Sequence, residues 1–384
     1  MIEIVILGNS VGGLAAALKL KKKLPEKSRV TLIEKKDPQY FYPSLLWVMT
    51  GKRNLNNIFR RLSFLHKEGI NYINEQAVEI LPERKKIRLK NSGELKYDLL
   101  LIATGAEYDE DIFPELKSAG YHLYELNDAV YLYQKLNTFK GGEIAFLISS
   151  LPIKCPPAVY EAALLVNNLL KKREPHLKFK ITIYTPERKS LDLLGLEMSQ
   201  LINKELEQQG IKVICNCKFT GIAESNKQLR FEGFNSSYDL LIYVAPHRGA
   251  EVIRRSSLGD SDGWLSADPH YLTTAYEDVF VSGDAALIKT PSGRDLLKAG
   301  VVTTFQLPAI SENINALARG KSPSNSYKGN VGCLIETGNG KTYAGIGNLY
   351  HQEKPWFRIL PASKCFKPGK SFVEYKWRKQ GKPL

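Results

Sequence analysis

A turn near the N-terminus has the residue types and spacing that bind a dinucleotide. Residues 8–13 read Gly-Asn-Ser-Val-Gly-Gly after the apolar run 2–7, and Glu34 follows the next apolar run, 30–33. Glycines in such a turn let the backbone approach a pyrophosphate, and the helix that begins there offers free N–H groups and the positive end of its dipole. The acid about twenty residues later accepts ribose hydroxyls. The alternative interpretation is a glycine-rich turn without a ligand.

The turn departs from the usual glycine pattern at Ser10. Its hydroxymethyl group crowds the place where the backbone would approach a phosphate most closely. The same hydroxyl can hydrogen-bond a phosphate oxygen, so the departure does not exclude binding.

The five cysteines suggest individual thiol chemistry. Their odd number and irregular spacing argue against the disulfide framework of a secreted protein. Cys155 stands just before the helical pattern 158–172, where the helix dipole favours a thiolate. Cys215 and Cys217 alternate along a predicted strand and are interpreted as small buried hydrophobic residues, and Cys365 is left unassigned. No complete zinc pattern is present, so no metal site is predicted.

One strand-and-turn phrase occurs twice, which predicts two similar domains. Residues 97–100 and 238–241 both read Tyr-Asp-Leu-Leu, and each continues as an apolar strand that ends in small residues. Strands predicted at 143–149 and 180–184 lie between the two copies. The strand at 278–282 runs into Gly-Asp and offers a carboxylate at a strand end, where doubly wound sheets hold ligands.

These elements predict an α/β fold of two Rossmann-like dinucleotide-binding domains, the second inserted in the first. Residues 146–153 follow the first strand of the second domain and contain no glycine, so we do not expect this domain to bind NADH. The predicted boundaries are 1–110 and 239–320 for the first domain, 111–238 for the second, and 321–384 for a C-terminal region.

Composition limits the kind of protein. A chain of 384 residues with 43% hydrophobic and 24% charged residues is an ordinary globular protein of two or more domains. It has no apolar run of about 18 residues and no leader after Met1, so we expect it in a reducing cytoplasm. The formal charge of +14 indicates attraction to an anionic partner.

Much of the positive charge lies at the C-terminal end. Residues 351–384 hold nine Lys and Arg against two Glu, interleaved with aromatic and aliphatic residues. Such a mixture suits the membrane interface and predicts an amphipathic membrane-interface segment. The alternative is a helix that packs on the protein body with a solvated basic face. No nucleic-acid motif accompanies the basic residues, so nucleic acid is not a predicted partner.

Together these phrases resemble the flavoproteins with two dinucleotide-binding domains, over nearly the whole chain. The resemblance implies FAD, with the first turn at its ADP part and the late Gly-Asp-Ala at its ribityl and pyrophosphate region. The implied contacts are Gly8, Ser10, Gly13, Glu34, Lys35, Val78, Thr104, Gly105, Gly283, Asp284, Lys298 and Gly300.

Within that group the chain resembles the sulfide:quinone oxidoreductase and flavocytochrome c sulfide dehydrogenase branch. Segment 40–51 is similar to the branch's segment after the first βαβ unit, and Lys298-Ala299-Gly300 is similar to its late motif. Residues 155–161 resemble its cysteine-before-helix motif, and residues 327–333 resemble its late cysteine motif. The resemblance therefore singles out Cys155 and Cys333.

The resemblance implies a sulfur relay. As a hypothesis, sulfide attacks a disulfide or sulfur-bridged state of Cys155 and Cys333 and leaves a persulfide on one sulfur, and the freed thiolate then reduces the flavin. Glu161 is a candidate proton acceptor, although it could equally serve the helix dipole. Lys298 is implied near the pyrimidine edge of the flavin, where its charge would stabilise the reduced ring. A solvated surface lysine is the alternative.

The expected protein is a peripheral, monotopic enzyme on the cytoplasmic face of a membrane. It would oxidise sulfide to polysulfide or sulfur and reduce membrane quinone. No cysteine lies between Ala106 and Ile153, where some members attach FAD, so non-covalent FAD is expected. The alternatives are a subunit that passes electrons to a cytochrome, a homologue using another sulfur donor, and a non-catalytic flavin-binding partner or sensor module. A homo-oligomer is left open.

Overall fold

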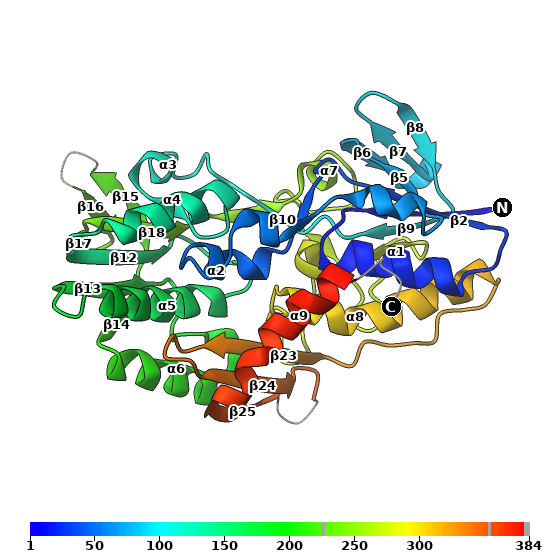
Figure 1. Cartoon of the computed structure of the whole chain (residues 1–384). Helices are drawn as coiled ribbons and strands as arrows, with labels where there is room; N and C mark the ends of the chain where they lie inside the picture. The colour runs from blue at the N-terminus through cyan, green and yellow to red at the C-terminus, as the bar shows by residue number, and fades with distance from the viewer. Residues whose placement is uncertain (224–226, 352–354, 380–384) are drawn as a thin grey trace.

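The computed structural model describes residues 1–223, 227–351 and 355–379. Its first sheet contains strands from both segments predicted to form the first domain, 1–110 and 239–320 (Figure 1). The strand order is β21-β9-β1-β2-β5, and every pairing is parallel. Its central strands are apolar along their length because both faces of such a sheet are covered. Helix α1 (Val11–Lys23) packs on α8 (Gly300–Ala318) beside this sheet. The strands are β1 Ile2–Leu7, β2 Ser28–Ile33, β5 Asn71–Ile73, β9 Leu99–Ile102 and β21 Val279–Val281.

A second parallel sheet has the order β11-β18-β12-β13-β14. Figure 1 shows it on the left and the first sheet on the right, with β10 between them, and the antiparallel pair β10 and β19 links the two regions. The prediction of two Rossmann-like sheets is confirmed. The elements are β10 Ala106–Tyr108, β11 Tyr121–His122, β12 Gly142–Ile148, α5 Pro157–Arg173, β13 Phe179–Tyr184, β14 Ile211–Ile214, β18 Leu240–Val244 and β19 His247–Gly249.

One strand prediction was wrong in this sheet. Strand β14 ends at Ile214, so Cys215 and Cys217 lie in the turn after it rather than along it. Asn216 between them has a φ of 55°, a left-handed conformation that no strand residue adopts. Cys217 is nevertheless buried and Cys215 half-buried, as expected for small hydrophobic side chains.

The C-terminal region contains an antiparallel sheet that the sequence did not reveal. Strands β23 (Asn330–Glu336), β24 (Thr342–Asn348) and β25 (Trp356–Ser363) pair in that order. Helix α9 (Lys367–Lys379) follows and contacts β23. The basic and aromatic segment is therefore part strand and part helix. Lys354 and Lys382, which contribute to its charge, lie outside the described residues.

Helix α9 is fixed to the body by one face. Trp377 is buried, the Arg60 guanidinium lies 4.4 Å from its ring centroid, and the Arg60 Nη1 donates to its carbonyl at 2.6 Å. The Glu374 carboxylate accepts hydrogen bonds from Arg53 at 3.2 Å and from the Ser44 hydroxyl at 3.1 Å. Residues three apart lie on the same face of a helix, so Glu374 and Trp377 together turn one face of α9 toward the protein body.

The remaining elements complete the surface and the connections. Among the described residues, no helix is both long enough and apolar enough to cross a membrane. The other bounds are β3 Gln39–Tyr40, α2 Leu45–Val48, β4 Phe59–Arg60, β6 Ala77–Leu81, β7 Lys86–Leu89, β8 Gly93–Lys96, α3 Leu116–Ala119, α4 Leu126–Asn137, α6 Leu196–Gln208, β15 Phe219–Ala223, β16 Gln228–Phe231, β17 Phe234–Ser237, α7 Glu251–Arg254, β20 Leu265–Ser266 and β22 Ala286–Leu287.

Replacing Trp377 by Ala should loosen α9 without unfolding the rest. The change removes a buried indole and its contact with Arg60, a loss of about 3 kcal/mol for a large buried aromatic residue. We expect limited proteolysis to cut the C-terminal helix much faster in this variant. Tyr375→Ala, which changes an exposed residue of the same helix, is the control, and equal cleavage of both variants would contradict the docking role of Trp377.

Candidate active site

The turn after β1 is shaped by two glycines whose Cβ positions are already filled. Gly8 has a φ of 101°, and a Cβ there would lie 2.4 Å from the Ala103 carbonyl oxygen. A Cβ on Gly13 would lie 1.8 Å from the Gly8 carbonyl oxygen. Ser10 caps α1 with a φ of −61°, and its hydroxyl donates to the Ala103 carbonyl at 3.3 Å. Ser10 is therefore accommodated in a backbone position that does not require glycine.

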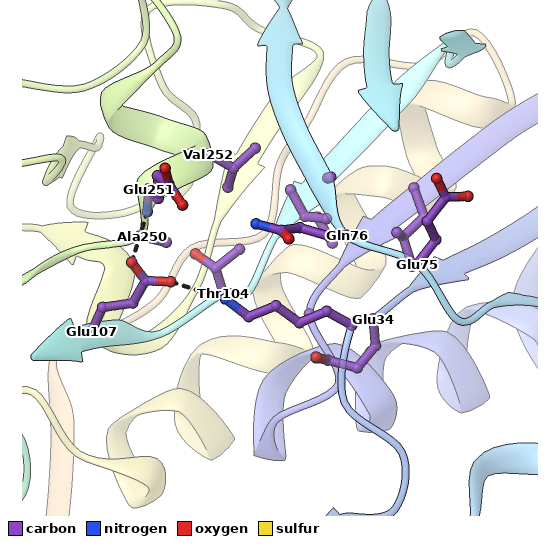
Figure 2. A pocket seen from close by; sticks show the side chains of 13 residues that line it. Glu34, Glu75, Gln76, Thr104, Glu107, Ala250, Glu251 and Val252 are labelled. Atoms are coloured by element: carbon purple, nitrogen blue, oxygen red, sulfur yellow. Dashed lines mark hydrogen bonds and ion pairs between the residues drawn. The ribbon is translucent and has the colours of Figure 1, made fainter. Parts of the chain in front are cut away.

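A pocket opens beside this turn (Figure 2). Glu34 receives the Asn9 amide at 3.0 Å on one carboxylate oxygen and the Lys36 amide at 2.9 Å on the other. Figure 2 shows Glu34, Glu75 and Gln76 on one side of the pocket and Glu107 and Glu251 on the other. The residues that line it are Leu7, Gly8, Ile33, Glu34, Lys35, Glu75, Gln76, Ala77, Thr104, Glu107, Ala250, Glu251 and Val252.

Two buried polar atoms at strand ends have no hydrogen-bond partner among the described residues. Within the described part of the chain, the Thr104 hydroxyl after β9 and the Oδ1 of Asp284 after β21 form no hydrogen bond. Buried polar atoms are almost always paired, so the unpaired Thr104 hydroxyl, which lines the pocket, and the unpaired Asp284 oxygen are candidate ligand contacts. Gly105 and Gly283 next to them have φ values of 70° and 72°. The donor set and the close-packed turn fit a flavin dinucleotide.

Three other residues predicted to contact FAD, namely Val78, Lys298 and Gly300, do not line this pocket. Val78 belongs to β6, and its neighbour Ala77, not Val78 itself, lines the pocket. Lys298 is buried, its Nζ donates at 2.9 Å to the carbonyls of Asp284 and Ala286, and it lies 3.9 Å from the Trp264 ring centroid. Two of its three N–H groups are thus used by the chain, and the solvated alternative is wrong. Gly300 is the first residue of α8.

Lys298 also holds the cysteine turn of the second region. Its carbonyl accepts the Cys155 amide at 2.6 Å. Cys155 has a φ of 47°, a conformation that is costly for a residue with a side chain and that persists only where neighbouring contacts impose it. The Tyr124 hydroxyl supports the same turn by donating to the Lys154 carbonyl at 2.9 Å. The Cys155 side chain is open to solvent although protein surrounds the turn.

Cys333 comes from β23 and interacts with Cys155. Both cysteines are free, α5, which begins just after Cys155, packs against β23, and the Cys155 thiol affects the ionisation of Cys333. Burial raises the pKa of Cys333 to about 12, with Cys155 and Glu161 adding to the effect. Although Cys155 has an exposed surface, the protein around its turn desolvates the thiol and raises its pKa to about 11, Glu161 raises the pKa further, and Lys370 opposes them. The expectation of a thiolate at Cys155 was wrong in direction, because burial and a carboxylate outweigh the helix dipole.

Two lysines near the thiols were not anticipated. Lys154 donates to the Tyr108 hydroxyl at 2.6 Å and lies near the faces of Tyr42, Tyr108 and Tyr124. Burial lowers its pKa to about 8, although Asp284 opposes the effect. Lys370 pairs with Glu161, which is 3% exposed. No motif marked either lysine, although the spacing of Lys370, Glu374 and Trp377 along one helix face was readable in the sequence.

The site defines a class of protein: a Rossmann-type flavoprotein oxidoreductase with one thiol, Cys155, at the turn after β12 of its second sheet and a second thiol, Cys333, on β23. Residues 2–306 match the family described as pyridine nucleotide-disulphide oxidoreductase, and the chain belongs to this family.

Curated sulfide:quinone oxidoreductases are similar to this protein over most of its chain. The mitochondrial sulfide:quinone oxidoreductase of Mus musculus is 21% identical over 88% of this chain and 76% of that protein. The sulfide-quinone reductase of Aquifex aeolicus is 25% identical over 81% of this chain and 76% of its own length. The crystal structure of the Aquifex aeolicus sulfide:quinone oxidoreductase superposes with a TM-score of 0.87 at 20% identity, over 99% of this chain and 91% of that one. The resemblance to this branch is confirmed, and the chain is a flavin-dependent oxidoreductase.

Replacing Gly13 by Ala should abolish flavin retention. The new methyl group would collide with the Gly8 carbonyl oxygen, so the turn would have to open and α1 would shift. Ser10→Gly changes the same turn without adding an atom and should retain flavin like the wild type. Flavin absorbance per protein after gel filtration measures both. Full flavin content in Gly13→Ala would contradict the proposed cradle.

Proposed function

We propose that this enzyme uses non-covalent FAD to oxidise sulfide to polysulfide or sulfur and to reduce membrane quinone. The observation that carries the proposal is the packing of α5, the helix that follows Cys155, against β23, the strand of Cys333, together with the effect of Cys155 on the ionisation of Cys333. The relatives named for sulfide and quinone support the same substrates. They do not favour the cytochrome-linked or non-catalytic alternatives.

The FAD would be held by the glycine turn, the pocket and the two strand ends. Glu34 would receive ribose hydroxyls, the N–H groups at the start of α1 would face the pyrophosphate, and Thr104 and Asp284 would find their missing partners. The sequence has no cysteine between Ala106 and Ile153, where some relatives attach FAD, which supports non-covalent binding. Bound FAD would supply the two-electron acceptor for the sulfur pair and the donor for quinone.

The second region is poorly suited to a nicotinamide dinucleotide. Its turn after β12 has no glycine, and Glu187, which follows β13 where a ribose-binding acid belongs, already has partners. The Glu187 carboxylate accepts hydrogen bonds from the Tyr160 hydroxyl at 2.5 Å and from the Thr185 hydroxyl at 3.0 Å. These contacts favour sulfide over NADH as the electron source.

The two cysteines would carry the sulfur. In the proposed step, HS⁻ attacks one sulfur of a bridged Cys155–Cys333 state, the bond between the cysteine sulfurs breaks, and a persulfide and a thiolate result. The attacking sulfur is oxidised by two electrons and the bridge is reduced. Since both cysteine pKa values are raised, a thiolate formed here needs nearby cations and a proton acceptor. Lys370 lies within range as the cation and Glu161 as the acceptor.

Cys155→Ser and Cys333→Ser should each abolish sulfide-dependent bleaching of the flavin, because neither can form the bridged state. Anaerobic titration with sulfide, followed by flavin absorbance, measures this. Cys365→Ser is the control: this exposed cysteine should be dispensable. Normal bleaching in either of the first two variants would refute the relay. Reoxidation of the reduced enzyme by a soluble quinone, compared with a cytochrome, then identifies the acceptor.

The C-terminal region would bind the cytoplasmic face of the membrane. Its exposed apolar side chains have basic neighbours: Lys376 lies 4.7 Å from the ring centroid of Phe372 and Lys379 lies 5.7 Å from that of Tyr375. Apolar groups would enter the interface while the cations meet anionic headgroups. We call the exposed face of α9 the apolar-basic patch; its exposed apolar members are Phe372, Val373 and Tyr375, and strands β24 and β25 add the exposed Ile346, Trp356 and Leu360 to the C-terminal region.

Replacing Phe372 and Tyr375 together by Ser should weaken binding to anionic vesicles about tenfold or more, because two aromatic side chains no longer leave water. Vesicle co-sedimentation of the flavin-loaded enzyme measures the change. Leu196→Ser removes an equally exposed apolar side chain from α6 and serves as the control. Unchanged vesicle binding in the double variant would exclude α9 from the membrane contact.

A further inference from the structure

A buried lysine from the C-terminal helix stands between the two elements that carry the cysteines. The Lys370 side chain is 13% exposed, its ammonium forms an ion pair with Glu161, and it lies 3.8 Å from a carboxylate oxygen of Glu336. Glu161 belongs to α5, whose N-terminal end follows Cys155. Glu336 is the last residue of β23, the strand of Cys333. The Lys370 ammonium thus connects α9 to both α5 and β23.

The two carboxylates depend on Lys370 to different degrees. Glu336 also accepts the Trp47 indole N–H at 2.5 Å and pairs with Lys52 at 3.2 Å. Glu161 has Lys370 as its one paired cation within the described residues. A buried carboxylate that loses its counter-ion becomes protonated rather than remaining charged. Loss of the Lys370 charge should therefore affect Glu161 much more than Glu336.

Helix α9 does not need Lys370 for its attachment. The pairs of Arg53 with Glu374 and of Arg60 with Trp377 fix the same helix further along. The charge at position 370 can therefore be removed while other contacts hold the helix. Its burial between carboxylates is costly in itself, so its place beside the thiols calls for an explanation other than stability.

We propose that Lys370 is a positioning residue through which the C-terminal helix keeps Glu161 charged and able to accept a proton beside Cys155. This inference deepens the proposed sulfide oxidation and rests on it. The groups that face Glu161 are Lys370 from α9, Glu336 and Cys333 from β23, and Cys155 before α5. Because the outer face of α9 bears the apolar-basic patch, the helix connects the predicted membrane contact to the thiol site.

The sign of the effect follows from these neighbours. Burial raises the pKa of Glu161, and Lys370 opposes the rise. Burial lowers the pKa of Lys370, but Glu161 and Glu336 outweigh it and the net pKa is raised, so the lysine stays charged at neutral pH. Removing the ammonium leaves burial and Glu336 to act on Glu161, so its pKa must rise further.

Lys370→Met in the flavin-loaded enzyme tests this. Infrared spectroscopy across pH follows the protonated-carboxyl band that Glu161→Gln removes, without sulfide or quinone. We expect the pH midpoint for titration of this band to lie at least one unit higher in Lys370→Met than in the wild type. In Lys370→Arg the midpoint should return to the wild-type value. Lys52→Met, which removes a cation from Glu336 but not from Glu161, should keep the wild-type midpoint.

A second readout connects the result to turnover. The acidic limb of the pH profile for sulfide oxidation should move to higher pH by a similar amount in Lys370→Met. An unchanged infrared midpoint, or an equal shift in Lys52→Met, overturns the role of Lys370 whether or not sulfide is the substrate. Should Lys370→Met fail to fold, Lys370→Gln carries the same test with a neutral polar side chain.

Discussion

The hydrogen bond from the Cys155 amide to the Lys298 carbonyl connects the two halves of the site. Lys298 is itself fixed, because its ammonium donates to the carbonyls of Asp284 and Ala286 at the end of the first sheet. A short chain of contacts therefore runs from the cofactor cradle through one lysine to the cysteine turn. The left-handed conformation of Cys155 is imposed by this arrangement, since few residues with a side chain adopt it unaided. The position of one thiol is thus set by the same strand end that would hold the cofactor.

Charge around the thiols is arranged in alternating pairs. Burial raises the pKa of Asp284, while the ammonium groups of Lys154 and Lys298 oppose the rise. On the other side, Lys370 lies between Glu161 and Glu336. Because each charge is desolvated, its ionisation depends on its neighbours rather than on solvent. In the proposed mechanism, proton transfer at the cysteines would therefore depend on residues from three separate elements, α5, β23 and α9.

Local patterns were enough to predict the framework but not the surroundings of the site. The glycine turn, Glu34 and the two strand sets follow from apolar runs and glycine spacing, which act over a few residues. Glu107 and Ala250–Val252 line the pocket because β10 and β19 pair, a long-range contact without a local signal. The pKa direction of Cys155 was missed because it depends on burial and on Glu161, not on the adjoining helix alone. The C-terminal sheet was missed because only β25 lies in the segment that had been interpreted as a membrane-interface segment, and β23 had been considered only for its cysteine motif.

Two interpretations of the C-terminal segment, a membrane-interface segment and a helix packed on the protein body, are compatible. Helix α9 turns Glu374, Trp377 and the largely buried Lys370 inward, and it exposes Phe372, Val373 and Tyr375. This differs from an ordinary amphipathic helix, whose inward face is apolar, because two of these three inward residues are charged. Exposed large apolar groups gathered on one surface are unfavourable in water and mark a contact with another apolar phase. Carboxylates and guanidinium groups of the body pair with the inward charges, which would leave the exposed apolar side chains free for the proposed membrane contact. The same helix can therefore pack on the protein and enter an interface, since each role uses a different face.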